Sequence, residues 1–330
     1  MELAAGTARP LPFAVMTRLP AVPARLLIVD REREAIAAQL TARRPGLEIR
    51  TRPRGEVTAA DLEWADAYMG FRPPPDLPLD AVAWVHSTGA GIDAYLFRRP
   101  FPTGTLLTRS GERFGIQIGE WCVARALAWT QELLALAEAQ RRRAWAPQHI
   151  RTLRGTRVLV VGTGEVGRGV AQAFQGLGCV VHGASRSGEA RAPFVTVRRV
   201  DHLAEAFAEA EIIVLTLPLT EATWHLVDAV LLAHCQGAML MNVGRGALVN
   251  EAALMPALDA GHLRAAALDV FEVEPLPESS PLWADPRVVI APHVAGLTTV
   301  AGAAESFLDA CAALERGERP PLAVDPVRGY

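Results

Sequence analysis

Short runs of apolar residues alternate along the chain with segments whose apolar residues recur at helical spacing. The run RLLIVD (25–30) is typical of a buried strand, and REREAIAAQLTARR after it is typical of a helix. Further strand-like runs are GLEIRTR, DAYMGF and AVAWVHS (81–87). Strands that alternate with helices favour a parallel α/β sheet. The first part of the chain therefore predicts a small doubly wound domain.

A second series of this kind follows a long amphipathic segment, residues 118–145, which predicts one continuous helix. RVLVVG (157–162) opens the series, which continues through CVVHGA, EIIVLTLP, AMLMNV, AAALDV and RVVIAPH. Six strands with helices between them predict a nucleotide-binding domain of the Rossmann type. A final helix, roughly 298–316, leaves no room for another domain, so we expect it to pack on the first one.

The pattern thus predicts an α/β protein of two doubly wound Rossmann-like domains with parallel sheets and a cleft between them. The predicted divisions are an N-terminal extension (1–24), a substrate domain (25–106 with 297–330) and a dinucleotide-binding domain (107–296). The extension is rich in alanine and proline, and Met16 offers an alternative translation start. Its short apolar stretch LPFAVM lacks a clear cleavage site, and no apolar run reaches the roughly 18 residues of a membrane span.

The amino-acid composition excludes several classes of reaction mechanism and binding partner. All 33 basic residues are arginine, which excludes mechanisms that need a lysine, such as a P-loop or a pyridoxal-phosphate Schiff base. The formal net charge of −3 gives no general attraction to nucleic acid or to an anionic membrane. The four cysteines lie far apart, without a CxxC pair or histidines at zinc-ligand spacing, so no metal site is predicted. Scattered cysteines are typical of a reducing compartment, and we expect a cytoplasmic protein.

The motif GTGEVG directly follows the strand-like RVLVV and directly precedes a helix-like segment. This order suits a dinucleotide-binding turn, in which Gly162 permits the tight turn, Gly164 lets the backbone approach a pyrophosphate, and Gly167 allows close helix packing. The cofactor-binding residues predicted here are Gly162, Thr163, Gly164, Glu165, Val166 and Gly167. The alternative is a glycine-rich turn that holds no ligand.

Three polar pieces fall near predicted carboxyl ends of later strands, where open α/β sheets bind ligands. They are NVGRGALVN with Arg245, LDVFEVEPLP with Asp269 and Glu274, and APHVAG with His293. Taken singly, each polar residue could be a turn cap, a loop charge or a strand-end histidine. Together, and after a nucleotide turn, they predict an active site.

The order, spacing and flanking residues of these pieces resemble the D-isomer-specific 2-hydroxyacid dehydrogenase family, from about residue 25 to the C-terminus. HSTGAGID, DVFEVEPLPESSPLW and VDPVRGY are most similar to bacterial glyoxylate/hydroxypyruvate reductases of the A type. The resemblance implies an enzyme that reduces a small 2-keto acid to the D-2-hydroxy acid with hydride from a nicotinamide cofactor. It implies no metal.

The resemblance also implies the role of each residue. His293 would be the general acid, Glu274 would orient its imidazole, and Arg245 would hold the substrate carboxylate and carbonyl. The backbone amides of Ala90 and Gly91 would bind the same carboxylate. Further cofactor contacts are expected at Leu217, Pro218, Val243 and Asp269.

The resemblance implies a homodimer as well. The segment 118–145 would bury its apolar face between subunits, with Trp145 directed towards the neighbouring cleft; the alternative is a core helix within one subunit. Arg72, in MGFRPPP, either lines the substrate cleft or is a solvated loop arginine, the reading that we favour. His86 is notable only as a neighbour of the substrate loop.

The stretch GASRSG ends the strand after the nucleotide turn, where an NAD site often has an acidic residue. Here Ser185 stands at that place, Arg186 carries a planar cation suited to phosphate, and Ser187 adds a hydroxyl. We therefore predict that NADPH is preferred over NADH. The alternative is that Arg186 projects into solvent and the site accepts either cofactor.

Two other functions remain open from the sequence. One is an NAD-linked dehydrogenase for another 2-hydroxy acid, of the phosphoglycerate type. The other is a non-catalytic, dinucleotide-sensing protein that resembles a corepressor. The sequence does not decide which 2-keto acid is the substrate, because pocket shape sets that choice.

Overall fold

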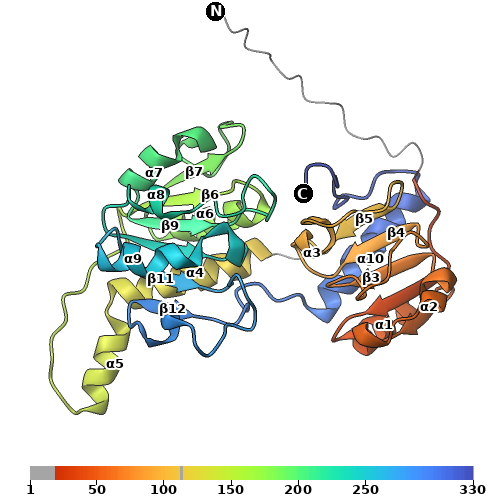
Figure 1. Cartoon of the computed structure of the whole chain (residues 1–330), viewed down its shortest axis with the longest axis horizontal. Coiled ribbons are helices and arrows are strands. Elements are labelled where there is room, and N and C mark those ends of the chain that lie inside the picture. Colours follow the sequence, from red (N-terminus) through yellow and green to blue (C-terminus); the bar gives the residue numbers. More distant parts are fainter. Residues whose placement is uncertain (1–18, 112–113, 330) are drawn as a thin grey trace, which may run out of the picture. The chain divides into compact units, whose positions relative to one another are not determined.

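The computed structural model describes residues 19–111 and 114–329. They form two compact units. Unit 1 contains residues 19–111 and 298–329, and unit 2 contains residues 114–297. Each unit is a parallel sheet with helices packed against it, as the ribbons of Figure 1 show. The α/β fold with two doubly wound parallel sheets is therefore confirmed.

Unit 1 has a five-stranded sheet in the order β2-β1-β3-β4-β5. Its strands are β1 (Arg25–Val29), β2 (Glu48–Thr51), β3 (Ala67–Gly70), β4 (Trp84–Ser87) and β5 (Leu106–Arg109). Its helices are α1 (Arg33–Arg43), α2 (Ala59–Trp64), α3 (Asp93–Leu96) and α10 (Val300–Glu315), with the 3₁₀ turn η1 (Arg54–Glu56). Alternate residues of β1 enter two separate cores, because side chains of a strand point to opposite faces of the sheet.

The last helix, α10, returns to unit 1 as expected. The ring of Phe307 on α10 stacks on that of Trp84 on β4, with centroids 4.6 Å apart and planes at 2°. Part of the predicted N-terminal extension also belongs to unit 1, since Leu19 and Val22 pack against the same core. Met16 lies outside the described residues.

Unit 2 has a seven-stranded sheet in the order β12-β11-β10-β9-β6-β7-β8. Its strands are β6 (Arg157–Val161), β7 (Val180–Ser185), β8 (Val197–Arg199), β9 (Ile212–Leu215), β10 (Ala238–Asn242), β11 (Leu263–Leu268) and β12 (Val288–Ile290). Its α-helices are α4 (Phe114–Thr130), α5 (Leu133–Arg141), α6 (Glu165–Gly176), α7 (Leu203–Glu209), α8 (Ala229–Leu232) and α9 (Leu254–Asp259). Its 3₁₀ turns are η2 (Val200–His202), η3 (Gly246–Leu248), η4 (Glu251–Ala253) and η5 (Pro281–Ala284). The strand order reverses between β6 and β9, and ligands of open α/β sheets bind at such a switch point.

Two strands were not predicted. β5 is a short LLTR run that pairs with β4 and so extends unit 1 beyond residue 106. β8 is an edge strand of three residues, VRR, whose polar sequence gives no strand signal. Unit 2 therefore has seven strands and not the six expected.

The single helix expected over 118–145 is wrong: the segment forms α4 and α5 with a break between them. Glu132 adopts a left-handed φ of +52°, and the Thr130 hydroxyl donates to the Ala126 carbonyl, a back-bond that bends helices. In Figure 1, α5 projects from the body of unit 2. The α-helix ends at Arg141, so Trp145 lies in the loop that follows.

All four cysteines are buried and unpaired. Burial raises the pKa of each thiol, to about 12 for Cys235 and Cys311. Among the described residues, no helix is long and apolar enough to cross a membrane. Within the same ranges, no three His, Cys, Asp or Glu side chains gather closely enough to hold a metal ion.

Candidate active site

The GTGEVG motif forms the turn between β6 and α6. Gly162 has a φ of +111°, and a Cβ there would lie 2.6 Å from the Thr216 hydroxyl oxygen. A Cβ on Gly167 would overlap the carbonyl oxygen of Gly162, so only glycine fits at either position. Gly164, by contrast, faces open space and begins α6 without a side-chain cap. The turn therefore places the amino end of α6, where an anion such as a pyrophosphate can be bound, at the switch point of the sheet.

Thr216, at the end of β9, completes this turn and was missed by the sequence analysis. Its hydroxyl donates to the carbonyls of Val161 and Gly162, at 3.2 and 3.0 Å. The only sequence signal was its position just before the predicted contacts Leu217 and Pro218. The Val243 amide donates to the Leu215 carbonyl, 3.2 Å away, which places Val243 beside them at the end of β10.

The end of β7 carries the residues predicted to distinguish NADPH from NADH. The hydroxyl of Ser185 accepts a bond from the Gly188 amide, and that of Ser187 accepts one from the Glu189 amide. Because each hydroxyl oxygen is the acceptor in these bonds, its own proton remains available to donate to a further acceptor. Arg186 lies between them and is exposed.

Arg191 is a second arginine at this edge of the turn that the sequence analysis did not single out. Its Nη1 atom donates to the carbonyl of Thr163, 3.2 Å away. The loop after β7 is thereby tied to the middle of the glycine motif. The two positions are 28 residues apart, so no local pattern could have revealed the contact.

His293 and Glu274 form the predicted pair. Nδ1 of His293 lies 2.9 Å from Oε2 of Glu274, and Oε1 of Glu274 accepts a bond from the Phe271 amide. Burial is the largest single influence on the pKa of Glu274 and raises it, but the bonds from His293 and the Phe271 amide, together with the charges of His293 and Arg245, outweigh burial and hold that pKa below the ordinary value. His293 adopts a left-handed φ of +56°, which a non-glycine residue seldom does and which is frequent at functional sites.

Asp269 fixes the backbone around this histidine. Its carboxylate accepts bonds from the amides of Val294 (2.8 Å) and Ala295 (2.9 Å), and its carbonyl accepts the amide of His293. Burial raises the pKa of Asp269 in spite of these bonds. Nothing in these contacts tests the expected role of Asp269 beside the nicotinamide, which stays a prediction.

Arg245 follows β10 in a loop that Asn242 shapes. The buried Asn242 side chain donates to the Arg245 carbonyl (2.9 Å) and accepts the Gly244 amide (3.2 Å). The guanidinium of Arg245 is close enough to help lower the pKa of Glu274. The structure thus gathers Arg245, Glu274 and His293 at the carboxyl ends of β10, β11 and β12.

Ala90 and Gly91 lie in unit 1, in the loop between β4 and α3. The Thr88 hydroxyl, at the start of that loop, donates to the Asp30 carboxylate at 2.6 Å, which fixes the backbone there. His86, on β4, is a core residue: it is fully buried, its Nδ1 lies 2.7 Å from the Thr108 hydroxyl, and burial lowers its pKa to about 3. Arg72 is exposed, as the favoured reading expected.

A glycine turn at the switch point of a parallel sheet, with an imidazole–carboxylate pair and an arginine at neighbouring strand ends, defines an NAD(P)-dependent oxidoreductase. The comparisons with known proteins specify the family. The family model "D-isomer specific 2-hydroxyacid dehydrogenase, NAD binding domain" matches residues 123–295. The chain therefore belongs to the D-isomer-specific 2-hydroxyacid dehydrogenases, which are NAD(P)-dependent enzymes.

Individual relatives support the same family assignment. A glyoxylate/hydroxypyruvate reductase A from Citrobacter koseri is 32% identical over 87% of this chain and 93% of its own length. A D-isomer specific 2-hydroxyacid dehydrogenase from Xanthobacter autotrophicus Py2, solved with NADPH and MES, is 33% identical with a TM-score of 0.83, covering 93% of this chain and all of its own. An NADPH-dependent glyoxylate/hydroxypyruvate reductase from Sinorhizobium meliloti, solved with NADP and sulfate, is 27% identical with a TM-score of 0.82, at 93% and 100% coverage.

Proposed function

We propose that this enzyme reduces glyoxylate or hydroxypyruvate, or a 2-keto acid of similar size, to the D-2-hydroxy acid and prefers NADPH. The observation that carries the proposal is the 2.9 Å contact between His293 and Glu274, beside Arg245, on the unit that bears the glycine turn. The relatives named as glyoxylate/hydroxypyruvate reductases support the choice of substrate.

Each of these residues has its own role in the proposed reaction. With Nδ1 of His293 held by Glu274, Nε2 is the atom that donates a proton to the substrate carbonyl oxygen. Arg245 pairs with the substrate carboxylate and polarises the carbonyl, and we propose that the amides of Ala90 and Gly91 bind the same carboxylate. When bound, the reduced nicotinamide supplies the hydride. Neutral His293 serves as the base in the reverse reaction.

The test is a panel of 2-keto acids of different length and charge, assayed with NADPH and with NADH. We expect the highest kcat/KM with glyoxylate or hydroxypyruvate and NADPH. Highest efficiency on a phosphorylated 2-keto acid with NADH would favour the phosphoglycerate type instead. Tight dinucleotide binding without turnover of any acid would favour a sensor.

Replacing Glu274 with glutamine should change the pH dependence of reduction. Reduction needs protonated His293, so kcat/KM falls as the pH rises. The Glu274 carboxylate, with its lowered pKa, stays ionised in the neutral range and favours the imidazolium. Without that charge, the alkaline decline of kcat/KM should move to lower pH. Profiles of kcat/KM from pH 5 to 9 measure the shift; superimposable wild-type and variant profiles would contradict the assigned role of Glu274.

The cofactor preference should depend on the end of β7. A charge-assisted contact of Arg186 with the 2′-phosphate contributes about 1.5–3 kcal/mol, or roughly tenfold to hundredfold in affinity. We expect NADPH to exceed NADH by at least about tenfold in kcat/KM, and Ser185→Asp with Arg186→Ala to abolish or reverse that ratio. Arg316→Ala, which removes a surface arginine of unit 1, should leave it unchanged. Equal efficiency of the wild type with both cofactors would refute the role of Arg186.

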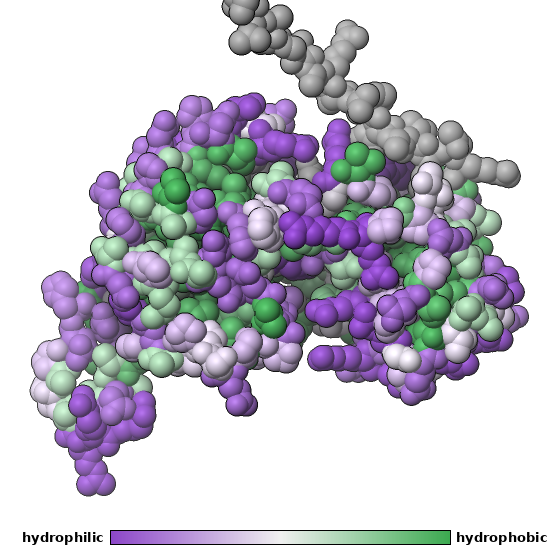
Figure 2. Space-filling model, in the orientation of Figure 1, coloured by the Kyte–Doolittle hydropathy of each residue, from purple (hydrophilic) through white to green (hydrophobic). Residues whose placement is uncertain are grey.

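We also propose a homodimer, with α5 and the loop after it at the interface. Leu133, Leu134 and Leu136 are 49%, 67% and 39% exposed, and Trp145 is 98% exposed. Figure 2 shows hydrophobic and hydrophilic side chains side by side on this projecting segment. Whether Trp145 reaches a neighbouring subunit, and whether the enzyme is cytoplasmic, stay predictions.

Light scattering at micromolar concentration should give the mass of a dimer, and Leu134→Glu should shift it towards the monomer because a charge would enter the apolar contact. Glu138→Gln on the same helix is the matched control. A wild-type monomer at that concentration would refute the proposal.

A further inference from the structure

Two glutamates next to the catalytic pair bind each other's backbone. The Glu251 amide donates to Oε1 of Glu272 at 2.9 Å, and the Glu272 amide donates to Oε1 of Glu251. The first residue belongs to η4 and the second to the loop that carries Glu274. This exchange ties two segments together that are 21 residues apart in the chain. It involves neither of the residues assigned to proton transfer.

His225 adds an imidazole to this pair. Its Nε2 is buried, lies 3.1 Å from Oε1 of Glu272, and is not aligned for a hydrogen bond, so the contact is an ion pair when the ring is protonated. The ring stacks on Trp224, with centroids 4.0 Å apart. The backbone of His225 has a φ of +50° and its amide donates to the Ala247 carbonyl at 2.7 Å. We call His225, Glu251 and Glu272 the carboxylate clasp.

The clasp joins the loops that carry Arg245 and Glu274. Gly246, directly after Arg245, is pressed against the Phe271 carbonyl so closely that a Cβ there would overlap it. The Phe271 amide in turn donates to the Glu274 carboxylate at 3.1 Å. Anything that keeps the 246–251 and 271–274 segments together therefore also sets the positions of Arg245 and Glu274.

Electrostatics explain why a histidine belongs there. Burial raises the pKa of Glu251, its bond from the Glu272 amide opposes this, and the nearby charges of Glu272 and Glu274 raise it further. Three carboxylates thus repel one another across two loops. When its ring is protonated, His225, 3.1 Å from Glu272, offsets part of that repulsion.

We propose that His225, Glu251 and Glu272 are positioning residues, which hold the Arg245 loop against the Glu274 loop and so keep the catalytic groups in reacting geometry. The clasp touches neither cofactor nor substrate in this assignment. The proposal rests on the proposed function only for the roles of Arg245 and Glu274.

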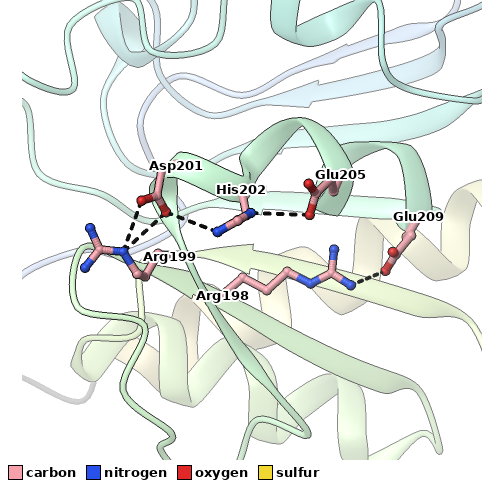
Figure 3. A network of polar contacts seen from close by, with 6 residues as sticks. All are labelled: Arg198, Arg199, Asp201, His202, Glu205 and Glu209. Atoms are coloured by element: carbon pink, nitrogen blue, oxygen red, sulfur yellow. Dashed lines mark hydrogen bonds and ion pairs between the residues drawn. The ribbon is translucent and has the colours of Figure 1, made fainter.

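Hydrogen–deuterium exchange tests the structural part on the full-length protein without any assay of turnover. In His225→Ala and Glu272→Ala, peptides covering 246–251 and 270–275 should exchange at least about tenfold faster than in the wild type, since their amide bonds open more often. The control is His202→Ala. Figure 3 shows His202 in a separate ion-pair network on η2 and α7, where its Nδ1 lies 3.4 Å from Glu205, near the sheet edge opposite β12. Unchanged exchange in both peptides would overturn the proposal.

Kinetics test the positioning part. The two clasp variants should lose about tenfold or more in kcat/KM for the keto acid, while the dissociation constant of NADPH stays within about twofold. Their alkaline decline of kcat/KM should move to lower pH, as in Glu274→Gln, because Glu274 is held less firmly against His293. A purely structural role would lower the melting temperature and leave kcat/KM and the pH profile unchanged, which would overturn the proposal.

Glu251 supplies a second pair of variants in case His225→Ala does not fold. Glu251→Gln keeps the oxygen that accepts the Glu272 amide and relieves the repulsion, so it should act like the wild type. Glu251→Ala removes the oxygen that accepts the Glu272 amide, so it should show the faster exchange and the lower kcat/KM. Equal activity and exchange in the two would refute the clasp. A wild type that turns over no 2-keto acid, but shows the predicted exchange changes, would refute the proposed function and leave the clasp intact.

Discussion

Replacing His293 with alanine is expected to lower kcat for keto acid reduction by about a hundredfold or more, because a positioned general acid contributes that much. Dinucleotide binding should persist, since the glycine turn lies between β6 and α6, whereas His293 follows β12. Steady-state kinetics with NADPH and glyoxylate measure the first effect, and fluorescence titration of NADPH measures the second. The Asp269 bonds to Val294 and Ala295 need only backbone amides, so the loop should keep its shape.

His202→Ala is the control for this experiment, since it also removes a histidine that contacts carboxylates in unit 2. It should keep the wild-type kcat. A His293→Ala enzyme with near-wild-type kcat would remove His293 from the mechanism. Loss of both NADPH binding and turnover would show instead that the variant had lost its fold.

Replacing Arg245 with lysine should be nearly as damaging, although the charge is kept. A guanidinium offers a planar fork that can hold the carboxylate and polarise the carbonyl at once, whereas an ammonium is a single point of charge. Loss of one charge-assisted hydrogen bond should lower kcat/KM by roughly tenfold to hundredfold. The Asn242 side chain holds the backbone of this loop, so the loop itself should be unaffected.

The measurement is kcat/KM for glyoxylate in the lysine variant, with Arg316→Lys as the matched control on unit 1. If Arg245 pairs with the carboxylate in both ground and transition states, KM should rise; if it mainly polarises the carbonyl, kcat should fall. Retention of wild-type kcat/KM in Arg245→Lys would exclude Arg245 from the substrate site.

The sequence predicted those parts of the site that local patterns specify. The turn between β6 and α6 was predictable because strand, glycines and helix follow one another directly. The contact of Glu274 with His293 was predictable from a family resemblance, since carboxyl ends of parallel strands gather at one edge of a sheet. Asp269 was recognised as a site residue, but its bonds to the amides of Val294 and Ala295 were not foreseen.

The parts of the site that the sequence did not predict depend on contacts between loops that are distant in the chain. Arg191 reaches Thr163, and His225 reaches Glu272, through turns whose course no short sequence pattern specifies. The break between α4 and α5 was hidden for a different reason. The helical spacing of apolar residues continues through it, while the left-handed backbone of Glu132 gives no signal of its own.

The burial of all four cysteines makes this chain well suited to single-site chemical labelling. Thiols that are buried, with raised pKa values, react slowly with maleimides while the protein is folded. The chain also has no lysine side chain to compete for the reagent. A cysteine introduced on the exposed face of α5 could therefore carry a fluorophore without prior removal of the native thiols, and its emission would report directly on association of two chains.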